Sequence, residues 1–324
     1  MPRTTRRDTA PALAAGLVTL ALGAGTALPA LAAAPEGWSP LLEPTELATL
    51  LEAHDEAIRI VHVTGDFEAG HIPGALHAPY AQWRSGPDNP GALRTEAHFA
   101  DLARSLGLTP DTPTVVVHGG ANPTDMGAAA RVYWTLRSLG VEDLALVNGG
   151  FAAWAEAGLP VSIEAVTIAP SEADFSWSDD WRVSTDEVVE LVEAGDARLI
   201  DARPEGFFSG LQWSIAAPGT IRNASNLTFA QFFDGNRMQG AETIREIAAR
   251  EGFTDAPLTV SFCNTGHWAA INWFALSELA EVPQTRLYPE SMAEYAALGH
   301  PLDNAPNRLV YYWRATSNWV SGLF

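Results

Sequence analysis

The sequence passes through the same series of segments twice, and this internal repeat constrains the fold more than any single motif does. Each copy contains an apolar, β-branched run, a loop, a stretch with helical periodicity and a closing Gly-x-Pro-apolar pattern. The matching segments are 114–117 with 258–262, 128–139 with 269–279, and 158–161 with 299–302. The loop after the apolar run begins at His118 in the first copy and at Cys263 in the second. We therefore expect the chain to hold two copies of one structural unit.

Within each copy, short β-branched runs alternate with amphipathic stretches. The amphipathic stretches are 45–53, 97–106, 185–193 and 241–251. This alternation is typical of an α/β fold in which helices cover both faces of a parallel sheet. We therefore predict two tandem α/β domains, at residues 39–163 and 182–303. The segment 164–181, which is rich in Ser, Asp and Pro, is the expected linker between them.

The first 34 residues have the pattern of an export signal. Three arginines precede an apolar, alanine-rich stretch over 12–28, and a small-x-small cleavage pattern follows at 30–32. We therefore predict a cleaved signal peptide at 1–34 and a periplasmic or secreted mature protein, exported by the Sec or the twin-arginine route. A membrane anchor is the alternative, but the apolar stretch is short for a span and contains glycines. No later stretch approaches the length of a span, so we expect no membrane association after cleavage.

The C-terminal tail, residues 304–324, is rich in aromatic side chains. Its aromatic residues are Tyr311, Tyr312, Trp313, Trp319 and Phe324. A disordered end is normally polar, whereas large aromatic side chains stabilise a protein when they are buried. We therefore expect the tail to pack onto one of the domains.

Charge and cysteine content exclude several classes of function. The chain has 39 acidic and 19 basic residues and a formal charge of -20, and it contains no lysine. A nucleic-acid partner is excluded because phosphate binding requires clustered cations, and lysine-based Schiff-base or P-loop chemistry is excluded as well. Cys263 is the only cysteine, so neither an intramolecular disulfide nor a thiolate metal site can form. The eight histidines show no paired spacing, and we expect neither a metal nor a cofactor.

Several short motifs resemble the rhodanese family. They are Gly70-His71-Ile72-Pro73-Gly74-Ala75, Asn148-Gly149-Gly150-Phe151 with Trp154, Asp201-Ala202-Arg203 and Pro218-Gly219-Thr220-Ile221. The plan, over roughly residues 39–303, is similar to that of the tandem-domain thiosulfate and 3-mercaptopyruvate sulfurtransferases. In that family only the C-terminal domain bears the cysteine, in a loop between a central strand and a helix. The resemblance thus implies that Cys263 is the active residue. It also implies that His118 occupies the corresponding position of the N-terminal domain, which lacks a cysteine.

The residues around Cys263 indicate a sulfur nucleophile independently of the family. The loop that follows it consists of Asn264, Thr265, Gly266, His267 and Trp268. A loop between a strand end and a helix start gathers backbone N–H groups, which favours a thiolate or a terminal persulfide anion. Gly266 allows the tight turn that aims the amides inward. We therefore predict that Cys263 takes a sulfur atom from a donor and holds it as Cys-S-S⁻ until an acceptor attacks. An inert buried thiol is the alternative.

The side chains expected near Cys263 each allow two interpretations of their role. His267 either assists the persulfide and the acceptor or simply packs, and Trp268 forms either a pocket wall or a contact with the other domain. Asp201 and Arg203 more simply form an ion pair that holds the loops than a direct substrate contact. We expect His118 to be structural.

Departures from the family pattern leave the donor open. Relatives carry cations in the cysteine loop and an arginine shortly after the Asp-x-Arg triplet, whereas Thr265 and Phe207 stand at these places here. The groups left to bind a donor are the loop amides, Arg203 and Arg222. We expect a small sulfur donor, namely thiosulfate, mercaptopyruvate, or a persulfide or polysulfide. The expected acceptor is cyanide, a thiol or a protein.

Two other functions remain as alternatives. The first is a non-catalytic sulfur carrier or binding module of a periplasmic sulfur pathway. The second is a phosphatase or arsenate reductase, which requires the pattern Cys-x5-Arg so that a guanidinium can hold the tetrahedral anion. Ala269 stands at that arginine position, which disfavours phosphate-ester chemistry.

Overall fold

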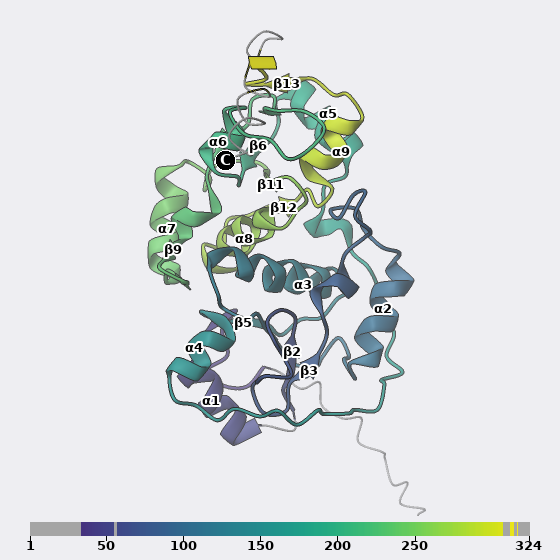
Figure 1. The fold of residues 1–324 in the computed structure, drawn as a ribbon, viewed down its shortest axis with the longest axis vertical. Helices are drawn as coiled ribbons and strands as arrows, with labels where there is room; N and C mark the ends of the chain where they lie inside the picture. The colour runs from purple at the N-terminus through teal and green to yellow at the C-terminus, as the bar shows by residue number, and fades with distance from the viewer. Residues whose placement is uncertain (1–33, 55–56, 307–311, 314–315, 317–324) are drawn as a thin grey trace, which may run out of the picture. The chain divides into compact units, whose positions relative to one another are not determined.

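The computed structural model describes residues 34–54, 57–306, 312–313 and 316 (Figure 1). The predicted signal peptide thus lies, except for Ala34, outside the described residues. No helix in the described part of the chain has both the length and the apolar character of a membrane span.

The first repeat forms a five-stranded parallel sheet with helices on both faces. Across the sheet the strands are β1 (Leu41–Leu42), β5 (Leu144–Val147), β4 (Thr114–Val117), β2 (Arg59–His62) and β3 (Leu76–His77). The helices are α1 (Pro44–His54), η1 (Tyr80–Trp83), α2 (Glu96–Ser105), η2 (Pro123–Asp125), α3 (Met126–Ser138) and α4 (Gly150–Glu156). Because successive strand residues point to opposite faces, Val116 packs with α2 and α3, while Val115 and Val117 pack with α1 and α4.

The second repeat has the same plan with a four-stranded parallel sheet. Across this sheet the strands are β12 (Thr285–Leu287), β11 (Thr259–Phe262), β6 (Arg198–Asp201) and β8 (Ser225–Asn226). The helices are η3 (Asp179–Trp181), α5 (Thr185–Ala194), α6 (Glu205–Phe208), η4 (Phe229–Phe232), α7 (Ala241–Arg250), α8 (Trp268–Phe274), the π-helical turn η5 (Ala275–Leu279) and α9 (Ser291–Ala297). Val260 packs with α5 and α9, and Ile200 packs on the other face with α7 and α8.

Two short antiparallel ladders complete the second repeat. They join β7 (Thr220–Ile221) with β13 (Leu302–Asp303), and β9 (Phe233–Asp234) with β10 (Arg237–Met238). The predicted fold class, two α/β units with helices on both faces of a parallel sheet, is confirmed.

Helices α3 and α8 lie side by side and join the two repeats (Figure 1). The ring of Tyr133 on α3 meets Phe274 on α8 edge to face, with 5.1 Å between centroids. The Tyr133 hydroxyl donates a 2.6 Å hydrogen bond to Glu278. One continuous core cluster contains residues of both repeats, so side chains of α3 reach the loop that precedes α8.

The register of the central strands matches between the repeats. His62, the last residue of β2, lies opposite Val117, and Asp201, the last residue of β6, lies opposite Phe262. The chain therefore leaves the carboxyl end of β11 at Cys263, beside Asp201. In open parallel sheets this edge is where ligands bind.

Two aromatic side chains of the tail lie among the described residues. Tyr312 is 66% exposed and Trp313 is 71% exposed. Tyr312 lines a pocket together with Ala217, Pro218 and Leu302 of the second repeat. The expectation that the tail packs onto a domain stays a prediction. The other aromatic residues of the tail, Tyr311, Trp319 and Phe324, lie outside the described residues.

Candidate active site

Cys263 lies in the loop between β11 and α8 and is only 1% exposed. The start of α9 holds the strand side of the loop. Cys263 N–H donates to Ser291 Oγ at 3.2 Å, and Cys263 O accepts from Met292 N–H at 3.0 Å. These hydrogen bonds fix the backbone N–H and C=O groups of Cys263. They do not involve its sulfur, which remains available to groups of the loop.

The backbone N–H groups of residues 264–267 have no hydrogen-bond acceptor among the described residues. Backbone donors without a protein acceptor remain available to water or to a bound anion. A run of converging N–H groups forms a concavity for an anion. The loop can therefore stabilise negative charge on or near the sulfur of Cys263.

Gly266 is required by the shape of this loop. Its φ is +69°, a conformation that residues with a side chain rarely adopt. A Cβ at this position would also collide with the carbonyl oxygen of Pro289 and the guanidinium of Arg131. The structure thus supports the role predicted for this glycine.

Two arginines of the first repeat reach the outer side of the loop. Arg84 Nη2 donates to Thr265 O at 2.8 Å, and Arg131 Nη1 donates to Gly266 O at 3.4 Å. Arg84 is 8% exposed and Arg131 is 1% exposed. Sequence reasoning named neither residue and expected fewer cations at the site. The available signal was Arg131 itself, a charged residue in the middle of the otherwise apolar stretch of α3.

These carbonyl contacts also set the direction of two loop amides. In a trans peptide the C=O and N–H groups point to opposite sides of the chain. Because the carbonyl groups of Thr265 and Gly266 face the arginines, the N–H groups of Gly266 and His267 point away from them. The arginines therefore hold these two N–H groups on the inner side of the loop.

Both ring nitrogens of His267 bind the first repeat. Nε2 lies 2.8 Å from Thr124 O, and Nδ1 lies 3.2 Å from Tyr80 Oη, so the bonding pattern assigns the proton to Nε2. Arg84 Nη1 in turn donates to Tyr80 Oη at 2.7 Å. Of the two readings of His267, the structure favours the packing role, since neither nitrogen is left for an acceptor.

The position of His267 makes the stability of the protein depend on pH. Burial, followed by the nearby charge of Arg84, lowers the pKa of His267 from 6.5 to about 4. Between these values the unfolded chain binds more protons than the folded protein, so the free energy of unfolding falls as the pH is lowered. Because His267→Gln cannot titrate, we expect this variant to lose less stability between pH 6.5 and 5 than the wild type. Urea unfolding at several pH values measures this difference, and equal slopes would contradict it.

Trp268 packs within its own repeat and also contacts the first. Its ring stacks on Phe229 with 5.1 Å between centroids, and Phe207 meets it edge to face at 6.1 Å. Its indole N–H donates to Thr124 Oγ1 at 3.4 Å. Phe207 thus extends an aromatic wall beside the loop.

Asp201 and Arg203 form a buried ion pair, as the simpler reading predicts. Arg203 Nη2 lies 2.6 Å from Asp201 Oδ2, and the two side chains are 1% and 0% exposed. The guanidinium also donates to Gly219 O at 2.7 Å and to Asn264 Oδ1 at 2.9 Å. With these partners Arg203 holds the cysteine loop, so the structure does not support its assignment to substrate binding.

Arg222 does not join the loop. It is exposed after β7, and its electrostatic neighbour is Tyr295 on α9. Among the described residues, no hydrogen bond connects Arg222 with residues 263–268. The predicted part of Arg222 in supporting the site or binding a donor is therefore not accompanied by a contact with this loop.

In the first repeat, a carboxylate of the protein occupies the corresponding loop. Asp125 Oδ2 accepts from Gly120 N–H at 2.7 Å and from Ala121 N–H at 3.4 Å, and Oδ1 accepts from Thr64 at 2.6 Å. His118 Nδ1 lies 3.8 Å from the same carboxylate. The amides of this loop are thus already satisfied, which agrees with a structural role for His118.

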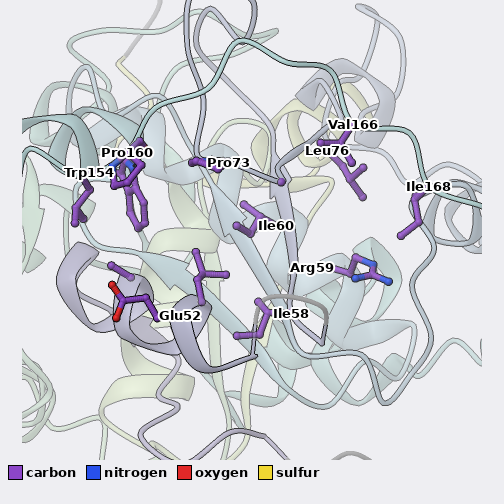
Figure 2. Close-up of a pocket in the computed structure, with 14 residues that line it drawn as sticks. Glu52, Ile58, Arg59, Ile60, Pro73, Leu76, Trp154, Pro160, Val166 and Ile168 are labelled. Carbon is purple, nitrogen blue, oxygen red and sulfur yellow. Dashed lines mark hydrogen bonds between the residues drawn. The ribbon is translucent and has the colours of Figure 1, made fainter.

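An apolar cavity of ≈ 520 Å³ lies elsewhere in the first repeat (Figure 2). Ile58, Ile60, Leu76 and Trp154 line it, and its charged lining residues are Glu52 and Arg59. None of the predicted site residues contributes to this cavity. Within the described residues, no group of His, Cys, Asp and Glu side chains could hold a metal ion.

A family model for the rhodanese-like domain matches residues 43–157 and 184–298. The chain belongs to the rhodanese family. The match covers both repeats, and the solved 3-mercaptopyruvate sulfurtransferase of Escherichia coli has the same rhodanese fold, with a TM-score of 0.68 at 23% identity over 78% of this chain and 98% of that chain. The predicted limits of the two rhodanese domains remain predictions.

Curated relatives include several sulfurtransferases. The thiosulfate sulfurtransferase of Gallus gallus is 31% identical over 71% of this chain and 80% of its own length. The 3-mercaptopyruvate sulfurtransferase of Escherichia coli K12 is 27% identical over 73% and 84%. A sulfur carrier protein of Thermus thermophilus is 29% identical over 75% and 90%. These rhodanese relatives support sulfurtransferase activity for this chain.

Proposed function

We propose that the protein transfers sulfane sulfur through a persulfide on Cys263. The observation that carries the proposal is the buried thiol in a loop with four unpartnered N–H groups, at residues 264–267. Such a loop stabilises an anion without any added group. The donor is thiosulfate, mercaptopyruvate, or a persulfide or polysulfide, and the acceptor is cyanide, a thiol or a protein.

The reaction consists of two displacements at sulfur. With thiosulfate, the Cys263 thiolate attacks the terminal sulfur, the S–S bond of the donor breaks, and sulfite leaves with the bonding electron pair. The enzyme then holds Cys-S-S⁻. Cyanide attacks the outer sulfur of this persulfide, so thiocyanate forms and the thiolate returns. The net charge is unchanged in each step, and no oxidant or reductant is required.

The persulfide needs more stabilisation than a thiol does. Its terminal sulfur carries a full negative charge, and the burial of Cys263 keeps most water away. The free N–H groups of residues 264–267 replace the lost hydration. The lone cysteine also protects the intermediate, since no second thiol of the chain can attack the persulfide to form an internal disulfide.

We also propose that this chemistry takes place outside the cytoplasm. The support is the export signal predicted at 1–34 from its arginines, apolar stretch and cleavage pattern. A protein of this kind would meet sulfur donors in the periplasm or the medium.

Sulfur loading tests the proposed mechanism. We expect purified mature protein, incubated with thiosulfate, mercaptopyruvate or polysulfide, to gain the mass of one sulfur atom with at least one of these donors. Cyanide should remove this mass and produce an equal amount of thiocyanate. Intact-protein mass spectrometry and a thiocyanate assay measure the two steps.

The same experiment distinguishes the alternatives. Absence of the adduct with every donor would overturn the persulfide mechanism. An adduct that forms but does not turn over with small acceptors would favour the sulfur carrier, the function named for the Thermus thermophilus relative. Hydrolysis of para-nitrophenyl phosphate that depends on Cys263 would favour the phosphatase.

A further inference from the structure

The two arginines behind the cysteine loop, Arg84 and Arg131, are buried, and neither forms a direct ion pair with a carboxylate of the described residues. The nearby carboxylate of Glu290 is paired with Arg182 at 2.7 Å. A buried charge that is not balanced by an opposite charge is costly, so its retention calls for an explanation.

Arg131 is held in place by neutral groups. Its Nη1 and Nη2 donate to the carbonyl oxygens of Gly266 and Gly91, and its guanidinium lies 5.0 Å from the ring centre of Trp134. Burial is the main cause that lowers its pKa to about 10, which leaves the side chain protonated at neutral pH. Its full charge therefore acts on the surrounding groups.

Cys263 is among the groups that sense this charge. Arg131 and Tyr80 both interact electrostatically with Cys263. Arg84 lies on the same side of the loop and connects Tyr80 with Thr265 O. The ionisable groups around the loop are thus Tyr80, Arg84, Arg131, Asp201, Arg203, His267 and Glu290. Asp201 with Arg203, and Glu290 with Arg182, are balanced pairs, so Arg84 and Arg131 provide the unbalanced charge.

We propose that Arg84 and Arg131 are positioning residues for Cys263. They hold the loop so that its N–H groups face the sulfur, and they supply the positive charge that balances the thiolate and the persulfide. The inference rests on the proposed function and adds to it that the rhodanese domain without a cysteine completes the active site. The cysteine loop, residues 264–268, contains no arginine or lysine, and the first repeat supplies the cations behind it.

Alkylation of the thiol tests this proposal. Cys263 is the only cysteine, so iodoacetamide reports on this thiol alone. We expect Arg131→Gln to slow alkylation at pH 7 about tenfold, because it removes a buried positive charge that stabilises the thiolate. Arg131→Lys keeps the charge and should stay within about threefold of the wild type. Thermal unfolding of each variant verifies the fold.

A matched control lies on the same helix. Arg137 also donates to a backbone carbonyl, at Glu142, and lies 5.4 Å from the ring centre of Trp181, but it does not contact the cysteine loop. Arg137→Gln should therefore leave the alkylation profile unchanged. If the Arg131 variants do not fold, Arg84→Gln and Arg84→Lys provide the same comparison, with an expected loss of about threefold for the glutamine variant.

The outcomes separate this inference from the proposed function. Equal profiles for wild type and Arg131→Gln, or equal losses in the lysine and glutamine variants, would overturn it. Alkylation needs no sulfur donor, so the comparison remains valid even if the wild type takes up no sulfur.

Discussion

The Cys263→Ser variant is expected to take up no sulfur and to lose at least about 10³-fold in thiocyanate formation, the scale of loss when a catalytic nucleophile is removed. Serine is close to cysteine in size, so it fits the loop and the N–H groups of residues 264–267 remain in place. A hydroxyl is not ionised at neutral pH and does not attack sulfane sulfur as a thiolate does. The loss should therefore come from chemistry and not from folding.

Two measurements are needed for this variant. Steady-state thiocyanate formation gives the activity, and the thermal unfolding midpoint gives the stability, which should change by only a few degrees. Since the chain has no other thiol, no sulfur can load elsewhere on a cysteine. A sulfur adduct that persists in Cys263→Ser would contradict the mechanism.

The Asp201→Ala variant is expected to be less stable than the wild type by about 3–5 kcal/mol, the cost of leaving one partner of a buried ion pair alone. Arg203 would remain buried with its strongest partner removed. Thr220 Oγ1, which donates to Asp201 Oδ2 at 2.7 Å, would also lose its acceptor. Because Arg203 binds Asn264 Oδ1, sulfur transfer should decline together with stability.

Urea unfolding measures the effect, and two variants act as controls. Glu281→Ala breaks the ion pair in which Arg245 Nη2 lies 3.2 Å from Glu281 Oε1. The side chains of Arg245 and Glu281 are 51% and 75% exposed, so the free energy of unfolding should fall by at most about 1 kcal/mol. Asp201→Leu combined with Arg203→Met removes both charges and should be more stable than Asp201→Ala alone. If Asp201→Ala were as stable as the Glu281→Ala control, the ion pair between Asp201 and Arg203 would not be holding the loop.

Much of the fold could be predicted because its signals are local. The predicted helix over 185–193 is observed at Thr185–Ala194, and the predicted helix over 241–251 is observed at Ala241–Arg250. Apolar runs with β-branched residues also identified β4 and β11 to within one residue. Periodicity is set by neighbours a few residues apart, so the sequence alone contains it.

The partners of the loop could not be predicted because they are distant in the chain. Arg84 binds a carbonyl 181 residues away, Arg131 one 135 residues away, and Tyr80 meets a histidine 187 residues away. Such contacts depend on how α3 and α8 pack, and single-sequence patterns do not encode this packing. For the same reason the sequence suggested that Arg203 binds the sulfur donor. In the structure its guanidinium already donates to Asp201, Gly219 and Asn264.

The sequence by itself determined the duplicated α/β plan and the place of Cys263 at the end of a central strand, because both follow from short-range patterns of apolar, turn-forming and reactive residues. Only the tertiary structure decided which charges surround the sulfur. The packing of the two repeats brings Arg84 and Arg131 behind the cysteine loop and satisfies His267 and Arg203 with other partners. The physical reason is that electrostatic stabilisation depends on distance in space and on burial, and neither can be obtained from spacing along the chain.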